Sequence, residues 1–123
     1  MNEECWPPEW TRAILALNAL AVIAAENTTY GYQIAQRLER AGFGKIKGGT
    51  LYPILARLEK DGLISSSWGE GAGGPGRKFV SITDGGRLEI AQRRQEWQTF
   101  TETVDRLWSI PDTRDSATDG EER

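Results

Sequence analysis

The sequence predicts a mainly α-helical fold with one small β-hairpin, an α+β protein. Apolar residues recur at helical spacing in four separate stretches of the chain, and the last of these stretches is the longest. Before that last stretch, two strand-like runs flank Gly69–Gly76, which holds five glycines and one proline in eight residues. The predicted order is therefore helix, helix, helix, strand, strand, helix.

Composition restricts the class of protein. The 123 residues suffice for one domain with its own core, and a content of 38% hydrophobic and 27% charged residues is typical of a soluble protein. The lone Cys5 cannot form an internal disulfide, which fits a reducing cytoplasm. The apolar run Ala13–Ala25 is too short to span a bilayer, and acidic residues precede it where a signal peptide carries positive charge. We therefore expect a cytoplasmic location and no membrane partner.

Charge is distributed unevenly along the chain, whose net charge is −3. Residues 1–30 carry a net charge of −3, residues 31–83 carry +4 and residues 84–123 carry −4. A basic middle between acidic ends is the pattern expected when one face of a protein meets phosphate groups. Ordinary surface charge is the alternative explanation, and charge alone does not separate the two.

The first two predicted helices supply much of the core. Residues 9–26 are apolar around most of the helical circumference, which predicts burial on several sides. A second helix is expected over residues 30–41, with Thr28 or Thr29 as its N-cap and Gly42 as its end.

The third helix is predicted over residues 49–61, after a connection over residues 43–48. One apolar face is formed at positions i, i+3, i+4 and i+7 by Leu51, Ile54, Leu55 and Leu58. Pro53 falls in the first turn, where its missing N–H costs nothing, and Asp61-Gly62 closes the helix.

The remaining elements follow in order. Strands are expected over residues 63–68 and 78–83, with residues 69–76 as a mobile loop. Thr83 is placed to cap a last helix over residues 84–109. The expected organisation is a domain over residues 1–83, whose first helix also contributes to a dimer, followed by a dimerisation helix over 84–109 and a disordered acidic tail over 110–123.

This order of elements matches a winged helix-turn-helix, in which the later helix of the pair enters the DNA major groove. Base-edge and phosphate contacts are expected from the exposed face of the third helix and from the basic residues around it. The candidate DNA-binding residues are Lys45, Lys47, Thr50, Tyr52, Arg57, Arg77, Lys78 and, through its hydroxyl, Tyr32.

Several of these residues also have purely structural explanations. Tyr30 and Tyr32 either pack the second helix against the third or offer a hydroxyl to phosphate. Arg57 either contacts DNA or pairs with Asp61 one turn later. Arg77 and Lys78 either contact DNA or protect an exposed strand edge.

Four segments resemble successive blocks of the PadR family of bacterial transcription regulators: YGYQIAQRLE, GTLYPILARLEKDGLI, GGPGRKFVSIT and the following DGGR. The resemblance covers about residues 13–108, and the single C-terminal helix is similar to that of the smaller members. It implies a homodimeric repressor on a roughly palindromic operator, with Lys47, Thr50, Tyr52 and the basic pair of the wing facing DNA. Gly48-Gly49 before the LYP motif and the glycine-rich wing depart from the family pattern, so base preference does not transfer.

The last helix carries an apolar stripe suited to a partner helix. Most of its members recur at a spacing of three or four residues, and the expected dimer interface comprises Trp97, Phe100, Val104, Leu107 and Trp108. The resemblance implies that Trp97 lines a dimer-interface pore for a small aromatic or planar effector, with Phe100 and Trp10 as further candidate ligand contacts. A packed interface core is the alternative explanation for Trp97 and Phe100.

An enzyme is not expected. The chain has no histidine, shows no metal-ligand cluster or cofactor motif, and places its only cysteine near the N-terminus. Gly69–Gly76 lacks the GK[ST] of a phosphate-binding loop. The competing hypothesis is a winged-helix module that assembles proteins without binding specific DNA, and Lys47, Arg57 and the basic wing pair argue against it.

Overall fold

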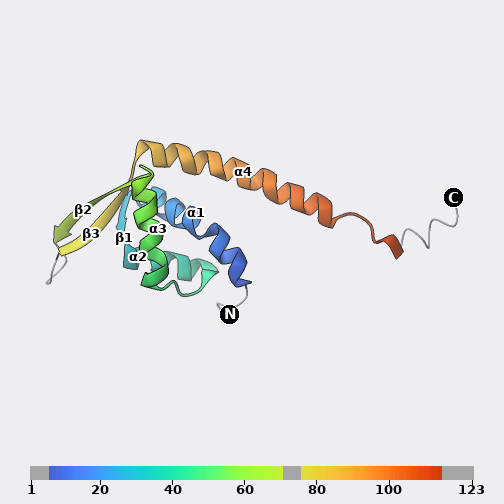
Figure 1. The fold of residues 1–123 in the computed structure, drawn as a ribbon, viewed down its shortest axis with the longest axis horizontal. Helices are drawn as coiled ribbons and strands as arrows, with labels where there is room; N and C mark the ends of the chain where they lie inside the picture. The colour runs from blue at the N-terminus through green and yellow to red at the C-terminus, as the bar shows by residue number, and fades with distance from the viewer. Residues whose placement is uncertain (1–5, 71–75, 115–123) are drawn as a thin grey trace. The chain divides into compact units, whose positions relative to one another are not determined.

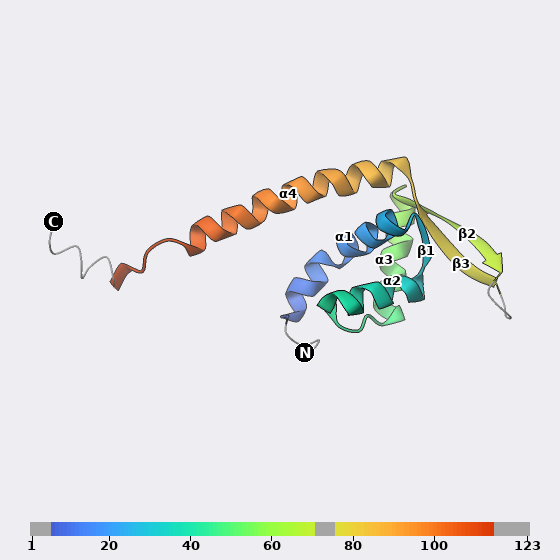
Figure 2. The same ribbon diagram turned by 180° about the vertical axis from the view of Figure 1, so that it is seen from behind.

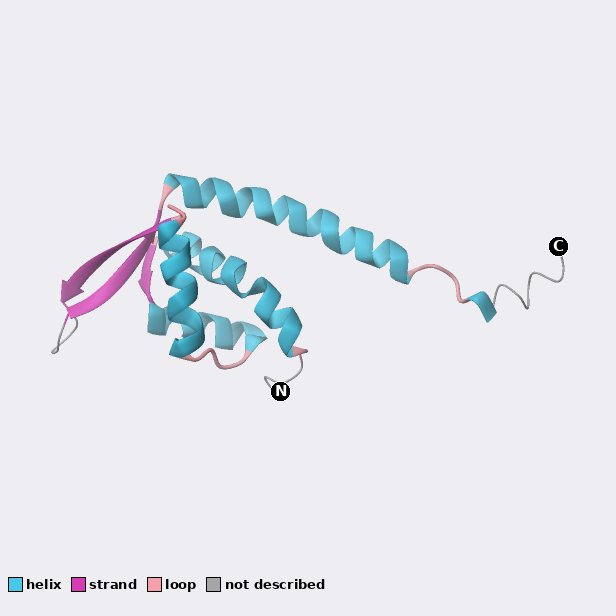
Figure 3. Ribbon diagram, viewed as in Figure 1, coloured by secondary structure: helices cyan, strands magenta, loops and turns pink. Residues whose placement is uncertain are grey.

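The computed structural model describes residues 6–70 and 76–114 (Figure 1). The chain forms two compact units, Met1–Gln92 and Arg93–Arg123. In order, the elements are α1 (Pro8–Glu26), β1 (Thr28–Tyr30), α2 (Gly31–Leu38), a π-helical turn (Glu39–Phe43), α3 (Gly48–Lys60), β2 (Ile64–Glu70), β3 (Gly76–Ile82) and α4 (Asp84–Trp108). Helices predominate over strands, and the predicted α+β fold is confirmed (Figure 3).

The core of the first unit lies where α1, α2 and α3 meet the sheet. Helix α1 is fully buried on one face and not on several sides as predicted, while the apolar face predicted for α3 is buried except for Ile54, which is half-buried. Full burial of one such side chain stabilises the fold by about 1.5–3 kcal/mol. The buried apolar residues are Leu15, Ala19, Leu20, Ile23, Ile34, Leu38, Leu51, Leu55, Leu58, Ile64 and Val80. Within the described ranges, no helix has the length and apolar character needed to cross a bilayer.

The second helix begins within one residue of the predicted start, but the predicted threonine cap was wrong and a strand was missed. Residues Thr28–Tyr30 form a strand that pairs antiparallel with β3, and α2 begins only at Gly31 (Figure 2). Thr29 is 1% exposed, and its hydroxyl donates to the side-chain carbonyl of Gln33 at 2.8 Å, so neither threonine caps the helix. Pairing with β3 satisfies the backbone of these residues and therefore overrides their capping propensity.

The helical backbone angles end at Gly42, as predicted, but the last turn is π-helical. The helix passes into the π-helical turn, where Gly42 has a φ of 106°, and the chain leaves this turn at Gly44 with a φ of 80°. Both values lie in the region that glycine adopts without steric cost. The indole N–H of Trp6 donates to the carbonyl of Gly42 at 3.0 Å and thereby ties the segment before α1 to this turn.

The hairpin completes a three-stranded sheet of order β1-β3-β2. The two strands of the hairpin are longer than expected, because Gly69 and Glu70 pair with Arg77 and Gly76. Of the mobile loop predicted over residues 69–76, residues 71–75 lie outside the described residues, as do residues 115–123 of the predicted disordered tail.

The start of α4 is joined directly to the end of α3. The hydroxyl of Thr83 accepts the backbone N–H of Gly86 at 2.9 Å, which confirms the predicted cap. The same hydroxyl donates to the carbonyl of Gly62 at 2.7 Å, and the backbone N–H of Thr83 donates to the carbonyl of Leu63 at 3.2 Å. Gly86 is buried, and a Cβ atom there would lie 2.1 Å from the Leu63 carbonyl oxygen.

This contact predicts different effects for two adjacent glycines. Gly86→Ala should lower the free energy of unfolding by roughly 1–3 kcal/mol, because the backbone around Leu63 must move to admit a methyl group. Gly85→Ala is the matched control, since its Cβ would lie 3.5 Å from the Gly62 carbonyl oxygen, an ordinary contact. Chemical unfolding followed by circular dichroism measures both variants, and equal stability of the two would contradict the packing described for Gly86.

Candidate nucleic-acid interface

Helix α3 has a buried face and an exposed face. Its buried face contains Leu51, Leu55 and Leu58. Thr50, Tyr52 and Arg57, the candidate contacts on this helix, are all exposed, as are Lys45 and Lys47 just before it. Lys47 is the N-cap residue, and its carbonyl accepts the backbone N–H groups of Thr50 and Leu51.

The ring of Tyr52 lies between two glycines. A Cβ atom at Gly31 would lie 2.6 Å from the Tyr52 hydroxyl oxygen, and one at Gly48 would lie 3.2 Å from its ring. The absence of side chains at these positions therefore lets Tyr52 rest against the first residue of α2. Tyr52 remains 57% exposed, so it both joins the two helices and faces solvent. Its joining role was not predicted.

The two basic residues of the wing have different partners. The guanidinium of Arg77 lies 4.2 Å from the ring centroid of Tyr30, a cation–π contact, and Tyr30 packs edge-on against Phe79. The ammonium of Lys78 lies 3.8 Å from a carboxylate oxygen of Glu59 on α3. Arg77 and Lys78 are adjacent on β3 but contact different elements, Arg77 the ring of Tyr30 and Lys78 the carboxylate of Glu59. The sequence had suggested an equivalent pair.

Glu59 holds the wing to α3 through a second contact. The hydroxyl of Ser66 on β2 donates to its other carboxylate oxygen at 2.7 Å. Glu59 therefore receives a hydrogen bond from β2 and lies near the cation of β3. Its carboxylate offsets part of the positive charge that Lys78 contributes to this surface. Glu59 was not among the residues predicted from the sequence.

A groove of about 360 Å³ lies between the N-terminal ends of α2 and α3 and the wing. We call it the wing groove, and it is lined by Tyr30, Gly31, Tyr32, Tyr52, Trp68, Arg77 and Lys78. It brings together four of the eight candidate DNA-binding residues, whereas Lys45, Lys47, Thr50 and Arg57 do not line it. Tyr32 is 65% exposed, and its hydroxyl accepts a hydrogen bond from the side-chain amide of Gln36.

Trp68 is the residue of this groove that sequence reasoning missed. It lies on β2 opposite Lys78 and is 73% exposed. A tryptophan so exposed on a strand, beside Arg77 and Lys78, offers a large aromatic surface to a partner. The available signal was its place at the end of the polar run Ser65–Ser67, where an aromatic residue next to a glycine-rich loop has little core to fill.

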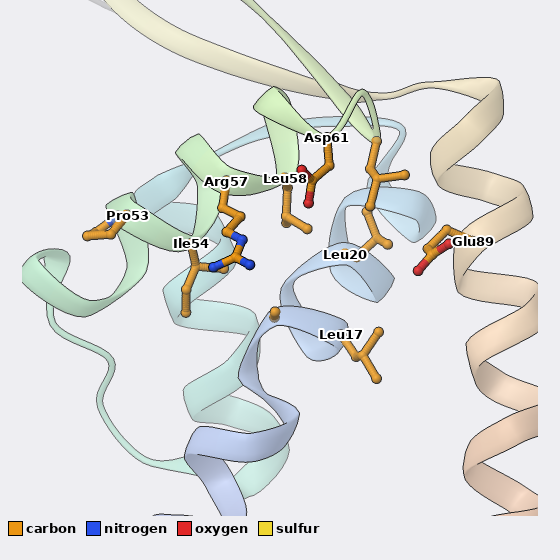
Figure 4. A pocket seen from close by; sticks show the side chains of 10 residues that line it. Leu17, Leu20, Pro53, Ile54, Arg57, Leu58, Asp61 and Glu89 are labelled. Atoms are coloured by element: carbon orange, nitrogen blue, oxygen red, sulfur yellow. The ribbon is translucent and has the colours of Figure 1, made fainter.

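Arg57 lies on the other flank of α3. It reaches into a cavity of about 480 Å³ whose lining includes Leu17 and Leu20 of α1 and Asp61 and Glu89 (Figure 4). No ion pair within 4.0 Å joins Arg57 to Asp61 in the described part of the chain, so the pairing considered as an alternative is not formed. DNA contact by Arg57 stays a prediction.

Comparison with known proteins agrees with this architecture. Residues 19–92 match the family model described as the transcriptional regulator PadR-like family. A transcriptional regulator of Mycobacterium tuberculosis is 34% identical over 96 residues, which cover 78% of this chain and 87% of that protein. The crystal structure of a PadR family transcriptional regulator from Eggerthella lenta is similar with a TM-score of 0.77 and 30% identity, over 84% of this chain and 88% of that one.

A second solved structure, of a PadR-like transcriptional regulator from Bacillus cereus, gives a TM-score of 0.72 and 29% identity, over 84% of this chain and 99% of that one. The family model spans more than half of the chain and includes α2, α3 and the wing. The chain belongs to the PadR-like family of transcriptional regulators, which are DNA-binding proteins and not enzymes.

Proposed function

We propose that the protein is a repressor that binds a palindromic operator as a homodimer, with α3 in the major groove and the wing on the adjacent backbone. The observation that carries this proposal is the wing groove. It joins Tyr52 of α3 to Arg77 and Lys78 of the wing in one surface. Helix and wing can therefore meet a single stretch of duplex together.

The charge of this surface supports a nucleic-acid partner over an assembly module. Residues 31–83 carry a net charge of +4, and this segment contains α2, α3 and the wing. Exposed cations that displace counterions from phosphate supply most of the non-specific affinity for DNA. A module that only assembles proteins does not need this excess of positive charge on one segment.

The second unit supports a homodimer. Its helical residues carry large apolar side chains that solvent reaches, with exposed fractions of 45% for Trp97, 57% for Phe100, 63% for Leu107 and 71% for Trp108. Such a stripe is typical of a surface that a partner covers. The same stripe on a second copy of the chain would cover this apolar surface. A dimer that holds two α3 helices one turn of DNA apart would then read two half-sites.

The same stripe suits a flat aromatic effector. The rings of Trp97 and Phe100 lie 5.7 Å apart by centroid, with an angle of 41° between their planes. A ligand that stacks on Trp97 in one dimer geometry and not in another would shift the population toward the first. Trp10 is 54% exposed on α1, and its part in ligand binding stays a prediction.

The affinity for DNA should fall as the salt concentration rises. The slope of log affinity against log salt concentration should be proportional to the number of phosphates that the protein neutralises. Lys47→Ala and Arg77→Ala should each reduce the slope of log affinity against log salt by about 1. Arg12→Ala on α1 removes the same charge and should leave the slope unchanged. Fluorescence anisotropy with the chain's own upstream DNA, with competitor DNA present, measures these slopes. Equal slopes for all three variants, or complete displacement of the upstream DNA by the competitor, would favour the assembly module.

Removing the carboxylate that faces Lys78 should strengthen DNA binding. Glu59→Gln keeps a polar side chain beside Ser66 while freeing the ammonium of Lys78. Since exposed ion pairs are worth about 0.2–1 kcal/mol, the affinity should rise by roughly 1.5- to 5-fold at low salt and less at high salt. Glu39→Gln in the π-helical turn makes the same charge change as a control. A similar gain in both variants would mean that net charge, and not Lys78, is responsible.

An aromatic effector should report through Trp97. Titrating the protein with planar aromatic compounds should quench its tryptophan fluorescence, and Trp97→Ala should remove that response. Trp108→Ala is the matched control because it deletes another exposed tryptophan of the same helix. If Trp97→Ala and the unaltered protein respond identically, Trp97 does not contact the ligand.

A further inference from the structure

The outermost stripe of α3 is small and mostly apolar. Gly49, Pro53, Ala56 and Lys60 follow one another at i, i+4, i+7 and i+11, which places them on one line along the helix. All four are exposed, and they lie opposite the buried face of Leu51, Leu55 and Leu58. Only Lys60, at the last residue of α3, brings a hydrogen-bonding side chain to this stripe.

The other polar side chains of α3 lie on its two flanks. On the flank toward the wing, the Tyr52 ring rests against Gly31, and Glu59 is engaged by Ser66. On the opposite flank, Thr50 and Arg57 are seven residues apart and share one side, and Arg57 reaches into the cavity beside α1 (Figure 4). The outermost stripe therefore carries no Asn, Gln or Arg that could read a purine edge with two hydrogen bonds.

The protein's own packing does not require the glycine at the start of this stripe. A Cβ atom at Gly49 would meet nothing within 4 Å, unlike one at Gly31 or Gly48. Gly49 is the second residue of α3, and no contact within the protein excludes a side chain there. Its lack of a side chain is explained if another surface must approach the helix backbone at that point, as the floor of a DNA groove would.

We propose that α3 reads its operator through the 5-methyl groups of thymines, which Ala56 and Pro53 contact in the major groove. This inference rests on the proposed function, since it requires α3 to enter that groove. The thymine methyl is the apolar group that the major groove displays, and an alanine methyl is a suitable partner for it. Small side chains at Gly49, Pro53 and Ala56 allow the close approach that such contacts need.

Replacing single thymines of the operator by deoxyuridine tests the proposal, because it removes the methyl group and keeps the base pair. With the unaltered protein, affinity by fluorescence anisotropy should fall roughly fourfold at one or more thymines of each half-site, the effect of one buried methyl group. Ala56→Gly should bind thymine and deoxyuridine equally at the position that Ala56 contacts, and Pro53→Gly, which also removes the apolar side chain, should do so at the position that Pro53 contacts.

The ratio of the two affinities within one variant cancels any loss of folding that the substitution causes. Ala25→Gly, at an exposed alanine of α1, should keep the fourfold ratio of the unaltered protein. A ratio near one at every thymine, with binding still specific for the fragment, would overturn this inference and leave the proposed function standing. A fourfold ratio that persists in both Ala56→Gly and Pro53→Gly would also overturn it. Absence of any preference for the fragment over competitor DNA would overturn the proposed function itself.

Discussion

Close contacts at glycines fix both ends of α3. At its N-terminal end, Tyr52 rests between Gly31 and Gly48 and thereby joins α3 to the start of α2. At its C-terminal end, the carbonyl of Gly62 accepts the hydroxyl of Thr83, and the backbone of Leu63 presses against Gly86. The buried leucine face holds α3 to the core, but these end contacts set its direction relative to α2 and to the first turn of α4. A regulator that reads DNA with one helix needs that direction to be constant.

The charged residues of the candidate site lie on α3 or just before it, and on the wing beside it. Although the net charge of the chain is −3, the segment that contains α3 and the wing is basic. The structure shows how the cations of this segment are positioned. The Tyr30 ring supports Arg77, and Glu59 engages Lys78 while Ser66 engages Glu59. The wing is thus attached to α3 through side chains that leave Arg77 and Lys78 exposed at the wing groove. The residues proposed to contact phosphate are thus the same residues that hold the wing in place.

Features that depend on a local sequence pattern were predicted correctly. The spacing of Leu51, Leu55 and Leu58 predicts the buried face of α3, and Thr83 before Asp84 predicts the cap of α4. It failed where the cause lies far along the chain. Strand β1 has only three residues and forms because Ser81, Val80 and Phe79 pair with it, some fifty positions later. No local pattern distinguishes such a strand from a helix cap.

The candidate site shows the same limit. Basic and aromatic residues could be selected from the sequence, but their partners could not. Nothing in the order of residues shows that Gly31 lies under Tyr52, that Glu59 faces Lys78, or that Trp68 belongs to the wing groove. The flank of α3 to which Arg57 belongs also depends on how the helix packs against α1. Helical periodicity defines the faces of α3, and only packing assigns each face to a neighbour.

Hydroxyl-radical footprinting on the upstream DNA tests most directly whether two copies hold two α3 helices at a fixed separation. Two protected patches should be found, related by a dyad and centred about 10–10.5 base pairs apart or a multiple of that distance. Both patches should form at the same protein concentration, because one dimer places both helices. A single protected patch under conditions of tight and specific binding would contradict a dimeric reader and would mean that one α3 and its wing suffice.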